Sequence, residues 1–126
     1  MTMTIVAVYG SLKKGFSNHD FLVDADYLAD AKVKGWDMYS FGPYPMAVPG
    51  DGTIAVELYA VDSQTLRSLD GLEGYPRFYD RKVVECWTEW CPVEAWMYFG
   101  TPDQVERLPQ VGSGVWTEQS RQPWAC

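Results

Sequence analysis

IVAVYGSLKKG, residues 5–15, is the stretch around which this chain is organised. Its first part, Ile5–Val8, is apolar and rich in β-branched side chains, which is the pattern of a buried strand. The run stops at Tyr9–Ser11, where Gly10 lets the backbone turn and a hydroxyl follows. A core strand that ends in a tight glycine turn can direct backbone N–H groups at a negatively charged ligand. We therefore predict a ligand-binding loop at this point.

Two better-known motifs do not fit the same loop. Gly10 and Gly15 have the spacing of the first glycines of a phosphate-binding P-loop, but Phe16 stands where that motif needs a lysine. Ser11 and His19 do not indicate a serine hydrolase, because no G-x-S-x-G elbow is present. The simplest interpretation of His19 is a local hydrogen bond, and that of the two lysines at 13 and 14 is solvated loop charge.

The composition is that of a single globular domain. The chain has 126 residues, of which 47% are hydrophobic and 21% are charged, and this suffices for a core of its own. Its net charge of −7 gives no support to nucleic-acid binding or to binding of an anionic membrane. No stretch approaches the roughly 20 apolar residues of a membrane span, and no signal segment opens the chain. We expect a cytoplasmic protein without nucleic-acid or membrane partners, and the oligomeric state stays open.

The cysteines do not indicate a metal site. Cys86, Cys91 and Cys126 are few, and the single histidine leaves a zinc site short of ligands. We interpret the thiols as structural, with a disulfide between Cys86 and Cys91 as the alternative, and we expect no metal.

Strands are predicted to be the majority of the fold. Alternating or apolar segments indicate further strands at 31–41, 53–61, 81–90 and 93–99. The prolines at 43 and 45 interrupt regular structure, and a turn is predicted at Pro49–Gly52. Glu57 lies inside the third of these five strands, either on a solvated face or directed into a pocket.

A helix is predicted from Asp62 to Glu73. Asp62 is an N-cap residue, and Gly74 supplies the stop. Glu73 therefore lies in the last turn, where the helix dipole, the charge of Asp70 and neighbouring aromatic rings would each raise its pKa. Such a pKa suits a carboxylate that exchanges protons near neutral pH. The alternative is a solvated glutamate at a fraying helix end.

The segment after residue 100 differs from the rest of the chain in composition. Prolines and glycines forbid a long regular element, yet Trp116 and Trp124 would be costly to leave in water. We predict a domain at residues 1–100 and an irregular tail at 101–126 that packs over the domain or stays loose.

Two motifs together resemble a known family. YGSLKKGFSNH at 9–19, followed by LDGLEGYPRFYDR at 69–81, is similar to the paired signature of the gamma-glutamylcyclotransferase-like superfamily. That superfamily includes gamma-glutamylamine cyclotransferases and plant avirulence-induced proteins. The resemblance runs from about Ile5 to about Phe99. It implies a single-domain α+β fold, with a mixed β-barrel-like sheet and flanking short helices. One departure is Val56, where the family often has glycine, and its branched side chain would narrow whatever space it faces.

The resemblance also implies a reaction and a set of site residues. The reaction converts a gamma-glutamyl group to 5-oxoproline and releases the attached amine, without a cofactor. The substrate's own α-amine attacks its γ-carbonyl, so neither an enzyme nucleophile nor a metal is required. Glu73 matches the catalytic glutamate as general acid and base, and the implied substrate-binding residues are Tyr9, Gly10, Ser11, Leu12 and Tyr79. A non-catalytic binding or regulatory module on the same fold is the alternative.

Overall fold

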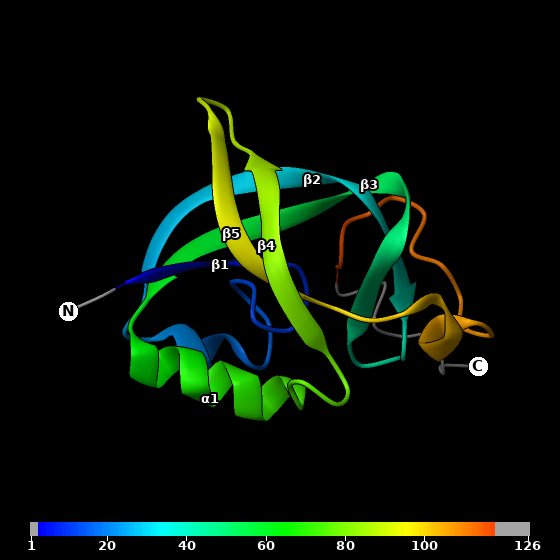
Figure 1. Ribbon diagram of the computed structural model, residues 1–126, viewed down its shortest axis with the longest axis horizontal. Coiled ribbons are helices and arrows are strands. Elements are labelled where there is room, and N and C mark those ends of the chain that lie inside the picture. Colours follow the sequence, from blue (N-terminus) through cyan, green and yellow to red (C-terminus); the bar gives the residue numbers. More distant parts are fainter. Residues whose placement is uncertain (1–2, 118–126) are drawn as a thin grey trace.

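The computed structural model describes residues 3–117, and within them five strands form a closed barrel with one α-helix beside it (Figure 1). The strands are β1 (Thr4–Val8), β2 (Asp26–Ser40), β3 (Pro45–Val61), β4 (Asp80–Trp87) and β5 (Pro92–Phe99). The α-helix is α1 (Ser63–Glu73), and two short 3₁₀ helices are η1 (His19–Leu22) and η2 (Pro102–Val105). The predicted α+β fold with a barrel-like sheet and short flanking helices is confirmed.

The strand β1 closes the barrel. The strand order is β1-β3-β2-β4-β5, and β1 pairs antiparallel with β3 and parallel with β5. Ala7 faces the barrel interior, whereas Val6 and Val8 belong to a second buried cluster that includes Leu69 of α1. Both faces of β1 are therefore buried, which explains why its sequence is apolar without alternation.

The helix α1 has the predicted caps. The side chain of Asp62 accepts a hydrogen bond from the backbone N–H of Thr65 at 2.7 Å. Gly74 ends the helix in the left-handed conformation, with φ at 64°. Leu69 is fully buried and anchors the helix on the outside of the barrel. Figure 1 shows α1 lying along one side of the barrel. Glu73 is the last residue of this helix. Within residues 3–117, no helix is long and apolar enough to cross a membrane.

The segment after β5 crosses to the end of the barrel formed by β2 and β3 (Figure 1). Backbone hydrogen bonds hold it there, from Val111 to Met38 at 2.7 Å and from Ala55 to Gly114 at 2.9 Å. Trp116 then enters the barrel, where it is 1% exposed and is among the largest fully buried side chains. Trp124, the other tryptophan expected to need cover, lies outside the described residues.

The predicted turn at Pro49–Gly52 is wrong, because β3 runs through these residues without reversing. Trp36 of β2 pairs with Pro49, and Lys34 pairs with Thr53, so the residues between bulge out of the ladder. Gly35, opposite the bulge, has φ at 92° and lets β2 adapt.

Two strands also have ends that differ from the predicted ones. The strand β2 begins at Asp26 instead of residue 31, and β4 ends at Trp87 instead of residue 90. The shorter β4 gives way to a turn in which the hydroxyl of Thr88 donates to the carbonyl oxygen of Cys91 at 2.7 Å. Cys86 and Cys91 are free thiols, so the alternative of a disulfide between them is wrong. Cys86 is buried, which raises the pKa of its thiol to about 11 and keeps it inert.

Candidate active site

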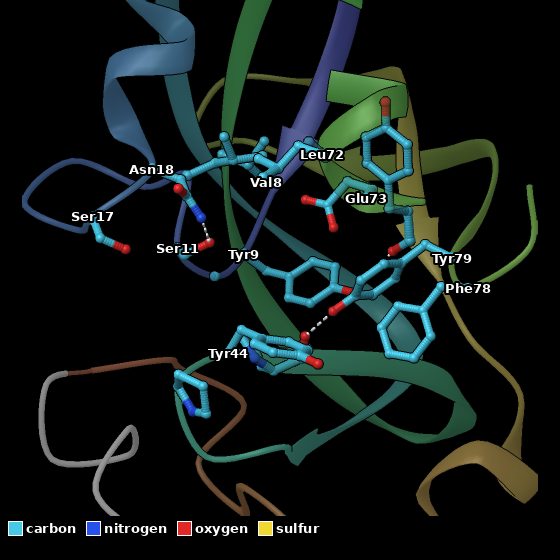
Figure 2. Close-up of a pocket in the computed structure, with 16 residues that line it drawn as sticks. Val8, Tyr9, Ser11, Ser17, Asn18, Tyr44, Leu72, Glu73, Phe78 and Tyr79 are labelled. Atoms are coloured by element: carbon cyan, nitrogen blue, oxygen red, sulfur yellow. Dashed lines mark hydrogen bonds between the residues drawn. The ribbon is translucent and has the colours of Figure 1, made fainter. Parts of the chain in front are cut away.

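A cavity of about 330 Å³ lies where the loop after β1 meets the end of α1 (Figure 2). All of the predicted site residues line it, namely Tyr9, Gly10, Ser11, Leu12, Glu73 and Tyr79. The remaining lining residues are Ala7, Val8, Ser17, Asn18, Pro43, Tyr44, Pro45, Leu72, Phe78 and Tyr98. Segments far apart in the sequence thus build one site, and the loop and the glutamate face the same space.

Glu73 is the one charged side chain among the described residues that line this cavity. Figure 2 shows its carboxyl group extending from the end of α1 into the cavity, close to Tyr9 and Tyr79. Burial raises the pKa of this carboxyl from 4.5 to about 7. The alternative of a solvated glutamate at a frayed helix end is therefore wrong.

The expected contribution of Asp70 to this pKa is also wrong. Asp70 forms an ion pair with Arg81, with 2.8 Å between Arg81 Nε and Asp70 Oδ1, and it accepts a hydrogen bond from the hydroxyl of Tyr98 at 2.6 Å. Arg81 neutralises the charge of Asp70, and burial is what raises the pKa of Glu73. Spacing along a helix showed that the two carboxyl groups are neighbours but not that a partner from β4 would neutralise one of them.

The two tyrosines of the predicted site have their hydroxyl groups occupied. The Tyr9 hydroxyl donates to the carbonyl oxygen of Tyr98 at 2.9 Å and accepts from the backbone N–H of Ala47 at 2.9 Å. The Tyr79 hydroxyl donates to the carbonyl oxygen of Pro45. Burial raises the pKa of both phenols far above their ordinary value, so both stay neutral. Their rings shape the cavity, and Glu73 is the residue of this lining whose pKa lies near 7.

The loop after β1 is folded tightly against its surroundings. A Cβ atom at Gly10 would lie 2.7 Å from the ring of Pro45, so only glycine fits at this position. The backbone N–H of Lys13 closes a turn on the carbonyl oxygen of Gly10 at 3.0 Å. Within the described part of the chain, the backbone N–H groups of Ser11 and Leu12 donate to no other residue. These N–H groups are available to a negatively charged oxygen in the cavity.

Aromatic rings that the sequence analysis did not assign to the site form a further wall. Tyr44 lies in the interruption between β2 and β3 and stacks on Phe41, with ring centroids 5.2 Å apart. Phe78 lies 6.3 Å from Tyr44 and 5.0 Å from Tyr79. The prolines at 43 and 45 predicted this interruption. No signal in the neighbouring sequence predicted that the segment folds back over the cavity.

Glu57 does not line this cavity. Its Oε1 accepts from the backbone N–H of Lys14 at 3.0 Å and from the hydroxyl of Tyr59 at 2.8 Å. It lies beside a wider space of about 510 Å³, which Val56 also lines. The carboxylate therefore braces the loop from behind, and Val56 leaves the width of the cavity around Glu73 unchanged.

Lys13 is buried, so the expectation of a solvated charge is wrong for it. Its side chain is 8% exposed, and its Nζ donates to the carbonyl oxygen of Trp116 at 2.7 Å. Desolvation lowers the pKa of this ammonium. Lys14 remains exposed and lies over the ring of Tyr27 at 3.4 Å. Among residues 3–117, no group of three or more His, Cys, Asp or Glu side chains is placed to hold a metal ion.

Comparison with known proteins gives consistent matches. The family model for gamma-glutamyl cyclotransferase, AIG2-like, matches residues 6–118. The chain is 35% identical to the gamma-glutamylcyclotransferase family protein YtfP of Escherichia coli K12, over 92% of this chain and 98% of that protein. It is 36% identical to the gamma-glutamylaminecyclotransferase of Rattus norvegicus, over 66% of this chain and 63% of that protein.

Among solved structures, an AIG2-like protein from Mus musculus superposes with a TM-score of 0.75 at 26% identity, covering 87% of this chain and 86% of the mouse chain. The family match reaches residue 118, so the segment after Phe99 has a family counterpart. The expected end of the resemblance near Phe99 is therefore wrong.

Proposed function

Because the chain belongs to the gamma-glutamyl cyclotransferase, AIG2-like family, we propose that it cyclises the gamma-glutamyl group of a small gamma-glutamyl amine or dipeptide to 5-oxoproline and releases the attached amine. The observation that carries this proposal is Glu73, a single and largely buried carboxyl group in a cavity of about 330 Å³, with a pKa of about 7. At neutral pH such a group is present in both protonation states, so it can both take and give a proton.

The proposed reaction needs two proton transfers and no co-reactant. The α-amino nitrogen of the substrate, in its neutral form, attacks the γ-carbonyl carbon, and Glu73 takes the proton that this nitrogen loses as the new bond forms. A carbon–nitrogen bond forms, and the carbonyl oxygen becomes an oxyanion. Glu73 then gives the proton to the leaving nitrogen, the original amide bond breaks, and the free amine departs. Substrate and products contain the same atoms.

The cavity also supports an orientation for the substrate. The α-carboxylate is placed at the Ser11 end, where free N–H groups are available. The leaving amine is placed toward Tyr44 and Phe78, which form the aromatic wall. Holding both ends of a flexible chain brings the amine and the carbonyl together, and this proximity supplies much of the rate enhancement in an intramolecular reaction.

The test is release of 5-oxoproline from a panel of gamma-glutamyl amino acids, gamma-glutamyl amines and glutathione, with wild type compared with Glu73→Gln. We expect turnover of at least one member by wild type and a loss of about 100-fold or more in the variant, as for removal of a general acid–base group. Equal turnover by both proteins would remove Glu73 from its role.

The position of Glu73 favours an enzyme over a non-catalytic module on the same fold, because a carboxyl group in the cavity with a pKa of about 7 is suited to proton transfer. That alternative would prevail if wild type bound 5-oxoproline but turned over no member of the panel.

A further inference from the structure

Asn18 contacts the loop at Ser11 twice. Its backbone N–H donates to the carbonyl oxygen of Ser11 at 2.9 Å, and its side-chain Nδ2 donates to Ser11 Oγ at 2.8 Å (Figure 2). Asn18 is the N-cap residue of η1, a position where an asparagine side chain ordinarily accepts from an N–H of its own helix. Here it makes no such bond, and the amide is directed at Ser11 instead.

In this contact the Ser11 hydroxyl acts as the acceptor of a hydrogen bond. A hydroxyl that accepts a hydrogen bond still has its own hydrogen to donate. Among the described residues, Ser11 Oγ has no acceptor for that hydrogen, and Ser11 lines the cavity. A ligand that fills the cavity can therefore accept this hydrogen. A negatively charged oxygen would form the strongest bond, because charge-assisted hydrogen bonds exceed neutral ones.

We propose that Asn18 is a positioning residue that holds the Ser11 hydroxyl with its hydrogen toward the cavity, where it donates to the α-carboxylate of the gamma-glutamyl group. The proposal rests on the proposed function. The carboxylate is chosen over the reacting carbonyl because it stays outside the forming ring, away from the bond that Glu73 acts on. In Figure 2, Ser11 and Glu73 lie apart, Ser11 on the loop after β1 and Glu73 at the end of α1.

His19 supports the same arrangement. Its Nδ1 donates to the carbonyl oxygen of Leu12 at 2.9 Å, so Asn18 and His19 together fasten two consecutive residues of the loop. The carbonyl oxygens of Ser11 and Leu12 are thereby occupied by donors from Asn18 and His19, whereas the backbone N–H groups of both residues remain for a bound anion.

The test compares Ser11→Ala, Asn18→Ala and the double variant, with turnover and 5-oxoproline affinity measured for each. Both substrate and product carry the carboxylate, so the two readouts should change together. For Ser11→Ala we expect KM and the dissociation constant of 5-oxoproline to rise about tenfold, the usual cost of a hydrogen bond to a charged group, with kcat little changed. Asn18→Ala should show a smaller rise in both, about threefold, and the double variant should be no worse than Ser11→Ala.

Asn18→Asp reverses the polarity. A carboxylate at this position can only accept, so it draws the Ser11 hydrogen away from the cavity, and KM should rise more than in Asn18→Ala. Gln64→Glu, an amide-to-acid change at an exposed position of α1, is the matched control and should leave KM unchanged. Thermal unfolding checks that each variant is folded.

The outcomes separate the two proposals. A fall in kcat with unchanged KM and unchanged 5-oxoproline affinity would overturn the positioning role of Asn18, and so would independent, additive effects of the two alanine variants. A wild type that neither turns over gamma-glutamyl compounds nor binds 5-oxoproline would overturn the proposed function, and this inference with it.

Discussion

Asp70 and Arg81 are joined by a two-point ion pair, with Nε to Oδ1 at 2.8 Å and Nη2 to Oδ2 at 3.2 Å. The pair ties the last turns of α1 to the start of β4. The guanidinium also lies over the rings of Tyr75 at 4.4 Å and Trp96 at 4.7 Å. The end of the helix that carries Glu73 is therefore fixed to the barrel by charge, hydrogen bonds and ring contacts together.

Arg81→Met is expected to destabilise the protein and to lower turnover. It leaves the carboxylate of Asp70 without its partner in a largely buried place, at a cost of about 1–3 kcal/mol. Urea unfolding measures this cost. Arg107→Met, at an exposed position after η2, is the control and should change stability by less than about 0.5 kcal/mol. Equal stability of the two variants would show that the ion pair does not hold the helix end.

The activity is expected to rise with pH through an inflection near 7. In the proposed reaction Glu73 must be ionised to take a proton from the attacking nitrogen, and burial raises its pKa to about 7. Below that value, kcat/KM should fall about tenfold for each pH unit. A pH profile of kcat/KM on a good substrate measures the inflection. An inflection near 4.5 would mean that Glu73 is not the base or that it is solvated in solution.

Glu73→Gln is expected to be more stable than wild type at pH 8. The unfolded chain releases the proton of Glu73 near pH 4.5 and the folded chain near 7, so in this window unfolding releases a proton and stability falls as pH rises. Above pH 7, ionisation of Glu73 in the folded protein lowers the free energy of unfolding by about 3 kcal/mol. Below pH 4.5 this loss is absent. Glutamine does not ionise, so its advantage should vanish at pH 4. Urea unfolding at both pH values tests this, and a constant difference would contradict it.

A leaving group without a second carboxylate is expected to be preferred. No cationic side chain is among the described residues that line the cavity, and Glu73 adds negative charge. The amide of γ-glutamate with butylamine and the dipeptide γ-glutamylnorvaline differ only in that carboxylate. We expect kcat/KM to favour the butylamine compound by about tenfold or more, since an anion would be buried unpaired. Equal values for the two compounds would contradict this orientation of the substrate.

Local sequence signals were sufficient where the structure depends on local physics. The apolar run of β1 and the caps Asp62 and Gly74 specify a buried strand and a helix without help from elsewhere. The Pro49–Gly52 segment was misassigned because glycine and proline are equally typical of a turn and of a bulge. Pairing with β2, which is set by residues far away in the sequence, decides between the two.

The two sequence motifs of the site could be predicted from the sequence. The residues that pack around these motifs could not. Tyr9–Leu12 and Glu73 carry recognisable chemistry, and the structure brings them to one cavity. The neutralisation of Asp70 by Arg81, the burial of Lys13 under Trp116 and the approach of Tyr44 all depend on contacts across the barrel. No spacing along the chain encodes such contacts, so a single sequence could not reveal them.

The position of Trp116 in the barrel interior limits how early the protein can fold during its synthesis. The carbonyl that Lys13 needs lies 103 residues further along the chain, and β1 cannot close the barrel until β5 exists. At a translation rate of about 5–20 residues per second, the amino-terminal loop waits about 5–20 s for its partner. The nascent chain thus emerges as unclosed apolar strands, so we expect the barrel to be completed only after Trp116 has been added.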